Sequence, residues 1–305
     1  MTTARIDWLT FRSQASPEVV AGTLQDVFGQ VQNVRLVPKN HGSKGFDEVG
    51  AIHLGGMVVG QYATGGVSQR GWSSFSVTGS GCEWVKDWGE AVECLEGVDY
   101  EVRRADLAVD TYRGEATHAK VVAGHEAGAF TMSGRPPKLK RIESWPREDG
   151  WTAYVGQREQ GKFFRGYEKG YEQAGKYGAA LGLAIQSIDG HPIADWYRCE
   201  VELKAKDRAL PEDLLLRRDE YFAGAYPFCR QLIDVEPFQL KACRERRPQL
   251  EMLRVLALIK HQWGRTLYTA QHAHGGDLSA VWDLVCGTEH SQSLLEAGVL
   301  LVEHS

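Results

Sequence analysis

Two short stretches of this chain alternate charged with uncharged side chains, and they constrain the fold more than any other feature of the sequence. The first, Arg104–Asp110, reads Arg-Ala-Asp-Leu-Ala-Val-Asp, and the second, Arg198–Lys204, reads Arg-Cys-Glu-Val-Glu-Leu-Lys. Successive side chains of a β-strand point to opposite faces of its sheet. Each stretch therefore predicts a strand whose charged residues share one face and whose apolar residues share the other.

The charged faces of these two strands carry four carboxylates, those of Asp106, Asp110, Glu200 and Glu202. Acids on an otherwise apolar strand are costly to bury unless they pair with cations or bind a metal ion. If the two strands are neighbours, their carboxylates form an oxygen-ligand site that suits Mg²⁺ or Mn²⁺. The residues alone leave a second interpretation open, in which arginines pair these charges on a solvated sheet face.

The remaining patterns predict an α+β chain with two parts. Residues 6–11 alternate like a half-buried strand, Ser16-Pro17-Glu18 has the composition of a helix start, and the glycine-rich region 42–81 is typical of strands and turns. After Pro211 the periodicity becomes helical. We therefore expect an antiparallel sheet with flanking helices over residues 1–208, followed by a smaller helical C-terminal region over residues 209–305.

Composition sets limits on partners and location. The net charge is −5, so any nucleic-acid surface must come from local basic patches. No window approaches the roughly 20 apolar residues of a membrane span, and the first residues lack the pattern of a secretory signal. We expect a cytoplasmic protein without membrane contact, whose six cysteines are reduced thiols.

A third cluster, Arg165–Glu172, places a tyrosine between cations. Tyr167 has Arg165 and Lys169 two residues to either side, where positive charge would favour the phenolate and so a nucleophile. A structural tyrosine is the commoner role for this residue type. Tyr171 lies one turn further if the segment is helical, and would then be a second candidate.

The order of these clusters resembles the replication initiation factor family of filamentous phages and rolling-circle plasmids. Four motifs carry the resemblance: Arg104–Asp110, Tyr154–Arg158, Arg165–Glu172 and Arg198–Lys204. Each motif is weak alone, whereas four in the same order are fairly specific. The similarity covers roughly residues 100–205 well and the N-terminal strand loosely. The tail over residues 205–305 is not diagnostic, although its length and helical character are similar to those of phage members.

The resemblance implies an enzyme that nicks one DNA strand at a replication origin. By this likeness Tyr167 attacks the phosphodiester, becomes joined to the 5′ phosphate and leaves a free 3′-OH that starts rolling-circle replication. Mg²⁺ or Mn²⁺ would be held by the four carboxylates named above. Arg165 and Lys169 would offset charge at the phosphate or lower the tyrosine pKa, and Glu172 would pair with Lys169 or activate water.

The implied partners are origin DNA, single-stranded or in a hairpin at the nick, and the helicase and polymerase of a bacterial host; a homodimer is left open. The candidate DNA contacts are Arg104, Arg158, Arg198, Lys138, Lys140 and Arg141. Two further basic patches, Arg35 with Lys39 and Lys44, and residues 241–265, are alternatives. His272-Ala273-His274 mimics a metal motif of other nucleases but follows a predicted helix, so a loop is the preferred interpretation.

Two other functions remain open on the sequence. One is a non-catalytic origin-binding or regulatory DNA-binding protein that keeps the fold. The other is a mobilisation relaxase of an integrative element, which shares the chemistry but not the origin.

Overall fold

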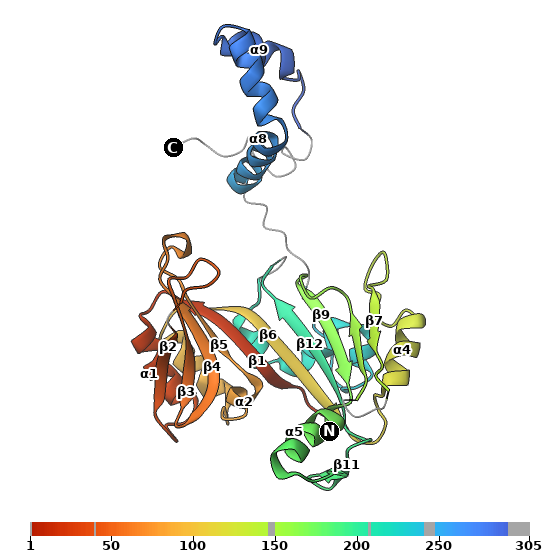
Figure 1. Cartoon of the computed structure of the whole chain (residues 1–305). Helices are drawn as coiled ribbons and strands as arrows, with labels where there is room; N and C mark the ends of the chain where they lie inside the picture. The colour runs from red at the N-terminus through yellow and green to blue at the C-terminus, as the bar shows by residue number, and fades with distance from the viewer. Residues whose placement is uncertain (1, 40, 146–149, 207–208, 241–247, 292–305) are drawn as a thin grey trace. The chain divides into compact units, whose positions relative to one another are not determined.

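The computed structural model describes residues 2–39, 41–145, 150–206, 209–240 and 248–291 (Figure 1). Within these residues one antiparallel sheet has ten strands in the order β2-β3-β4-β5-β1-β6-β12-β9-β8-β7. Their bounds are β1 Arg5–Ser13, β2 Val34–Lys39, β3 Glu48–Leu54, β4 Met57–Thr64, β5 Ser73–Val77, β6 Tyr100–Thr111, β7 Leu139–Ile142, β8 Thr152–Val155, β9 Lys162–Tyr167 and β12 Tyr197–Lys204. A separate hairpin pairs β10 Ser187–Ile188 with β11 His191–Pro192.

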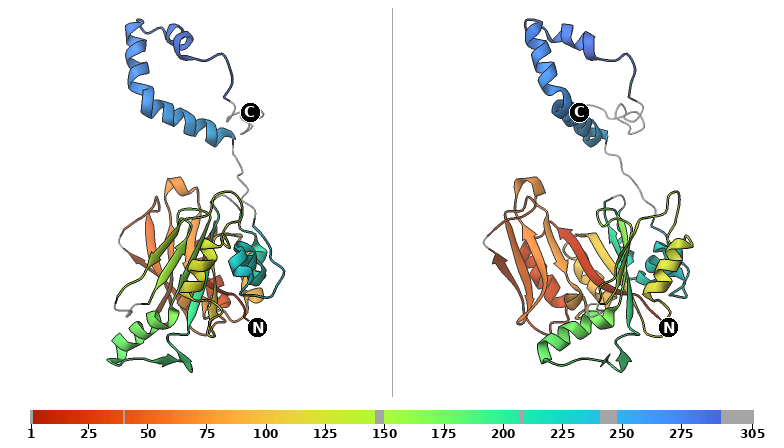
Figure 2. Two further views of the ribbon diagram at one scale, coloured as in Figure 1. Left: turned by 90° about the vertical axis from the view of Figure 1, so that its right-hand side faces the viewer. Right: turned by 45° about the vertical axis from the view of Figure 1, so that its right-hand side comes forward.

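Helices lie on both faces of this sheet, and Figure 2 shows α5 on the opposite side from α6 and α7. The bounds are α1 Pro17–Val27, α2 Gly79–Cys82, α3 Trp88–Glu96, α4 His118–Glu126, α5 Lys169–Leu181, α6 Arg218–Ala225 and α7 Pro227–Arg230, with 3₁₀ turns at Val67–Gln69 and Glu212–Leu215. The helix start expected at Ser16 is confirmed, because its side chain accepts a hydrogen bond from the amide of Val19 and Pro17 begins the helix.

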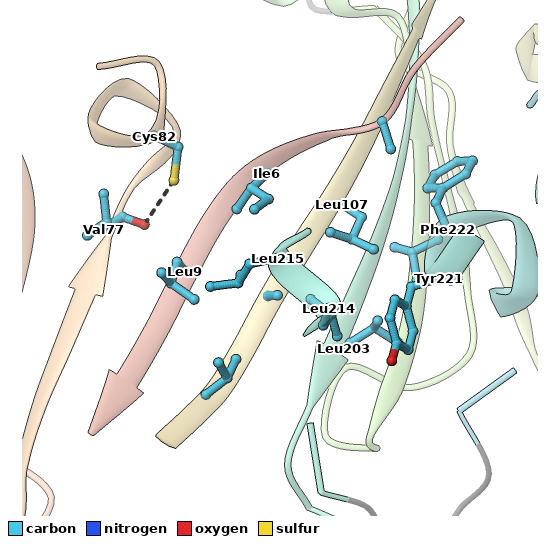
Figure 3. Close-up of a cluster of buried hydrophobic side chains, with 14 of the residues drawn as sticks. Ile6, Leu9, Val77, Cys82, Leu107, Leu203, Leu214, Leu215, Tyr221 and Phe222 are labelled. Atoms are coloured by element: carbon cyan, nitrogen blue, oxygen red, sulfur yellow. Dashed lines mark hydrogen bonds between the residues drawn. The ribbon is translucent and has the colours of Figure 1, made fainter. Parts of the chain in front are cut away.

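The core lies on the face of the sheet that carries α6. Leu107 of β6, Leu203 of β12 and Leu9 of β1 pack there with residues that follow β12, including Leu214, Leu215 and Phe222 (Figure 3). Alternation sends the charged residues of β6 and β12 to the opposite face, as the sequence predicts. The same residues that build the core therefore fix which side of the sheet can hold a polar site.

The compact sheet unit extends further along the chain than the expected boundary at residue 208. It runs through Cys243, because the segment with Leu214, Leu215 and Phe222 completes the core rather than starting a new one. The second unit, residues 244–305, contains α8 Pro248–Ala273 and α9 Leu278–Val285, which contact each other. The basic stretch 241–265 lies partly outside the described residues.

The sheet repeats one topology in its two halves. Outward from the centre, the first half runs β1-β5-β4-β3-β2 and the second runs β6-β12-β9-β8-β7, and in both halves a helix follows the central strand. The sequence shows no corresponding repeat. In the second half α5 and the β10–β11 hairpin are inserted between β9 and β12.

No helix in the described part of the chain is long and apolar enough to cross a bilayer. The five cysteines that the structure describes form no disulfide with one another.

Candidate active site

Strands β6, β12 and β9 are neighbours, so the charged stretches and the tyrosine share one face. Glu202 lies opposite Asp106 on β6, and Arg198 lies opposite Asp110. On its other side β12 pairs with β9, where Arg198 lies opposite Tyr167. Directly opposite residues of an antiparallel pair point to the same face. The adjacency that the alternating pattern requires for a joint site is therefore present.

Tyr167 ends β9 with its hydroxyl directed at β12. This hydroxyl donates a 2.7 Å hydrogen bond to Glu200 Oε1, and the tyrosine is only 4% exposed. Burial and the charge of Glu200 raise the pKa of Tyr167 above its ordinary value. Burial, together with the charge of Asp7, also raises the pKa of Glu200.

The expectation that flanking cations lower the tyrosine pKa is wrong for this arrangement. The Arg165 guanidinium lies 3.8 Å from the centroid of the Tyr167 ring, and Lys169 Nζ lies 5.5 Å from it. Both cations contact the ring face rather than the oxygen, so the carboxylate of Glu200 dominates at the hydroxyl. Deprotonation of Tyr167 consequently needs an acceptor, and Glu200 is in place to be one.

A cleft of about 1000 Å³ lies over this face of the sheet, and Tyr167 and Glu200 line it. Among the described residues that line it, seven arginines and lysines meet seven aspartates and glutamates. The cations are Arg5, Arg104, Arg158, Arg165, Lys169, Lys176 and Arg198. The acids are Asp7, Glu83, Asp106, Glu172, Asp189, Glu200 and Glu202. The cleft is polar and close to charge balance rather than a basic funnel.

Arg104 joins the acids of β6 and β12. Its Nη2 lies 2.5 Å from Asp106 Oδ2 and 2.7 Å from Glu202 Oε2, and its Nε donates to Asp106 Oδ1 at 2.8 Å. Arg158 reaches the same Glu202 oxygen at 3.3 Å. Burial nevertheless raises the pKa of Asp106 to about 6. One guanidinium nitrogen thus lies between two carboxylates, at the position that a cation shared by them would take.

Arg198 is the most deeply buried cation of the site, with a side chain 4% exposed. Its Nε and Nη2 bind both oxygens of Asp110 at 2.7 and 2.8 Å, and its Nη1 binds Asp7 Oδ1 at 2.7 Å. Arg5 and Trp196 also bind Asp110. Although burial opposes it, the hydrogen bonds from Arg198 lower the pKa of Asp110.

These contacts change the roles expected for Arg198 and Asp110. Arg198 was expected to touch the DNA backbone, but its guanidinium is occupied by two acids and it joins β1 to β6. Asp7 was missed by the sequence analysis. It belongs to the half-buried strand expected over residues 6–11, and the register shift between Ile6 and Trp8, which lies beside it, has no signal in the sequence.

The carboxylates do not form a ready cation site in this arrangement. In the described parts of the chain, no group of three or more histidine, cysteine, aspartate or glutamate side chains is placed to hold a metal ion. Asp106 and Glu202 share Arg104, and Asp110 is held by Arg198. Both interpretations of the sequence are therefore partly met, because the acids do lie together but arginines pair them.

The start of α5 brings a further ion cluster to the cleft. Lys169 Nζ lies 2.8 Å from Glu172, whose other oxygen lies 2.6 Å from Lys176. Burial and the nearby charge of Arg198 lower the pKa of Lys169. The expected pairing of Glu172 with Lys169 is confirmed. Tyr171 is not among the residues that line the cleft, because Tyr167 ends a strand and the two tyrosines do not share a helix face.

Comparison with known proteins shows the family of this chain. The sequence profile of a family described as replication initiation factor matches residues 100–273, more than half of the chain and including all three site strands. The chain belongs to the replication initiation factor family. A solved rolling circle replication initiator protein from Geobacillus stearothermophilus is similar over 67% of this chain and 75% of that one, with 21% identity and a TM-score of 0.47. No curated protein matches this chain.

In this replication initiation factor the candidate basic patch at residues 138–141 divides between two faces. Lys140 lies opposite Tyr154 of β8, which lines the cleft, whereas Arg141 lies opposite the buried Ala153 and pairs with Glu143 at 3.6 Å. Arg158 lines the cleft and is largely exposed. His272 belongs to the second unit, where its ring bonds the carbonyl of Tyr268.

Proposed function

We propose that this initiation factor nicks one strand of origin DNA through Tyr167 and starts rolling-circle replication from the free 3′-OH. The observation that carries the proposal is the hydrogen bond from the Tyr167 hydroxyl to Glu200, inside a polar cleft. Tyr62 and Tyr221 also donate to carboxylates, but neither lines the cleft. The pair of Tyr167 and Glu200 lines it together with seven cations, which is what supports a chemical role. The membership of the family supports the same reaction.

The proposed chemistry exchanges one phosphoester for another. The Tyr167 oxygen bonds to phosphorus as its proton passes to Glu200 Oε1, 2.7 Å away. The bond from phosphorus to the 3′ oxygen breaks, and that oxygen takes up a proton. The phosphotyrosyl bond keeps the ester, so the reverse reaction with a 3′-OH reseals the strand. Glu200 would contribute about 10²–10⁴-fold as the proton acceptor.

Cations beside the tyrosine are suited to the charge that develops on the phosphate. Arg165 lies over the ring, and its Nε has no hydrogen-bond partner among the described residues although it is buried. Such an atom is typical of a site that binds an oxygen ligand. Lys169 would protonate the leaving 3′ oxygen, a role that its pKa, lowered by burial and by the charge of Arg198, supports.

The Mg²⁺ or Mn²⁺ expected from the family resemblance stays a prediction. The acids as arranged do not fit a preformed site, because Arg104 and Arg198 hold them. An ion would bind Asp106 and Glu202 only after Arg104 moves. The steps proposed here accordingly use the side chains of this chain alone.

The decisive experiment is the search for a covalent adduct. The full chain is incubated with supercoiled DNA that carries its origin, with Mg²⁺ or Mn²⁺, and a 5′-linked protein–DNA species is sought on a denaturing gel. We expect an adduct with the native chain and with Tyr171→Phe, and none with Tyr167→Phe, which still binds the origin.

Two outcomes would overturn the proposal. An adduct that survives in Tyr167→Phe would assign the nucleophile elsewhere. Origin binding without any nick in the native chain would support the non-catalytic DNA-binding alternative. A mobilisation relaxase would form the same adduct at a transfer origin, and the DNA sequence that is cut distinguishes it.

A further inference from the structure

We infer that the cleft continues across β8 to the edge strand β7 as a track for one unpaired DNA strand, whose phosphates contact Lys140 and Lys138 and whose base stacks on Tyr154. This inference rests on the proposed function and adds to it the route by which the substrate strand leaves the site. The inference is drawn from the pairing register of β9 with β8 and of β8 with β7.

One row of side chains crosses the sheet on the cleft face. Lys140 lies opposite Tyr154, Tyr154 opposite Arg165, and Arg165 opposite Glu200. Since directly opposite residues share a face, this row leads from the acceptor of the Tyr167 proton to the edge of the sheet. Strand spacing places Lys140 about 10 Å from Arg165 along the row.

The cations at the end of the row are available for phosphates. Lys138 and Lys140 are exposed, and among the described residues neither lies within salt-bridge distance of a carboxylate. Lys138 comes directly before β7, and its carbonyl accepts a hydrogen bond from the amide of Gly156 at 2.8 Å, so it lies beside the same edge. The cations nearer the tyrosine are paired with acids, so the edge is where the track gains net positive charge.

An aromatic platform lies between the two ends of the row. The Tyr154 ring stacks on Phe163, with centroids 5.6 Å apart and planes 25° from parallel, and both residues line the cleft. Stacking on aromatic side chains is how proteins hold unpaired bases irrespective of sequence. A duplex cannot use such a platform because its bases are already stacked, so the occupant is a single strand.

The opposite edge of the sheet offers a matched comparison. Arg35 and Lys39 lie on β2 and are exposed like the two lysines, but β2 is seven strands from β9 whereas β7 is two strands away. Arg141 offers a second comparison, because it neighbours Lys140 in sequence but faces the other side of the sheet and pairs with Glu143.

The test measures binding of a fluorescein-labelled oligothymidylate to the full chain by anisotropy over a range of salt concentrations. We expect Lys138→Ala/Lys140→Ala to weaken binding and to reduce the slope of log K against log salt by about 1.4, the value for two lost phosphate contacts on a single strand. Tyr154→Leu, which keeps an apolar contact to Phe163, should weaken binding roughly tenfold without changing the slope. Arg141→Ala and Arg35→Ala/Lys39→Ala should bind like the native chain.

Equal losses in Lys138→Ala/Lys140→Ala and Arg35→Ala/Lys39→Ala would overturn the track, since they would show a diffuse charge effect. A larger loss for duplex than for oligothymidylate would overturn it as well. The adduct at Tyr167 is assayed separately, so its formation together with unchanged oligothymidylate binding by the lysine variant would refute the track and leave the proposed function standing.

Discussion

Tyr167 and Glu200 are joined by a hydrogen bond across neighbouring strands, with 2.7 Å between the phenol oxygen and Glu200 Oε1. The bond connects the end of β9 to the middle of β12, so both groups are set by rigid sheet geometry rather than by a loop. The hydroxyl of Tyr167 is thus bonded to a carboxylate. The neighbouring cations, Arg165 and Lys169, lie over the tyrosine ring.

Replacing this carboxylate tests its role in proton transfer. We expect Glu200→Gln to slow nicking about 10²–10⁴-fold, because an amide of the same shape accepts the hydrogen bond but cannot take the proton. The rate of adduct formation in single-turnover assays is the measurement, and DNA affinity should stay within a few-fold of native. Nicking at the native rate would show that Glu200 does not receive the proton.

Arg198 should matter for stability more than for DNA contact. We expect Arg198→Ala to lower the free energy of unfolding by about 3–5 kcal/mol, because it leaves the largely buried Asp110 and the half-buried Asp7 without their main cation. Urea denaturation measures the loss. The control is Arg217→Ala, which removes exposed pairs to Asp213 and Glu220 and should cost less than about 1 kcal/mol. Equal effects would contradict the buried role.

Arg104 should compete with divalent cations for Asp106 and Glu202. We expect Arg104→Gln to bind Mn²⁺ at least about fivefold more tightly, since removing a positive charge roughly 4 Å from the ion is worth about 1–4 kcal/mol. Free Mn²⁺ in solution, followed by electron paramagnetic resonance, gives the affinity. Arg12→Gln, which removes an exposed pair to Glu101, should not change it. Unaltered Mn²⁺ affinity in Arg104→Gln would exclude these two acids as a cation site.

The ion cluster of Lys169, Glu172 and Lys176 on α5 should make the stability of the fold depend on pH. Although burial opposes it, hydrogen bonds from Lys169 and Lys176 lower the pKa of Glu172 to about 2. A carboxyl whose folded pKa lies below its unfolded value near 4.3 stabilises the fold above that value, and loses the contribution as pH falls toward 2. The stability difference between native and Glu172→Gln chains should therefore shrink between about pH 5 and pH 2. Carboxyl-carbon NMR of Glu172 should show a midpoint near pH 2, which Lys169→Met raises.

The strand pair at the centre of the site was predictable because period-two alternation is a local property. Arg104–Asp110 and Arg198–Lys204 each determine which side chains share a face, and the requirement to bury the apolar side orients both. Tyr167 was found through its motif rather than through its environment. Nothing local in the sequence shows that its hydroxyl meets Glu200.

The sequence could not predict the features of the site that depend on how strands far apart in the chain pair with one another. The register shift between Ile6 and Trp8 belongs to the pairing of β1 with β6, and the pairing of β7 with β8 decides that Lys140 rather than Arg141 shares the face of Tyr154. The core contribution of Leu214 and Phe222, which moves the end of the compact unit to Cys243, also arises from tertiary packing. These features are determined by contacts between residues that lie far apart along the chain.

The two halves of the sheet share one topology, but the candidate nucleophile and its carboxylate partner lie only in the second half. By position β4 and β5 are the counterparts of β9 and β12, yet β5 reads Ser73-Ser-Phe-Ser-Val77 and holds none of the ionisable groups of its counterpart. The first half contributes to the cleft through its central strand, by Arg5, Asp7 and Trp8, and through Gly79, Ser80 and Glu83, which follow β5. Substitutions in the outer strands of the first half should therefore leave the proposed reactive groups, which lie on β9 and β12, in place.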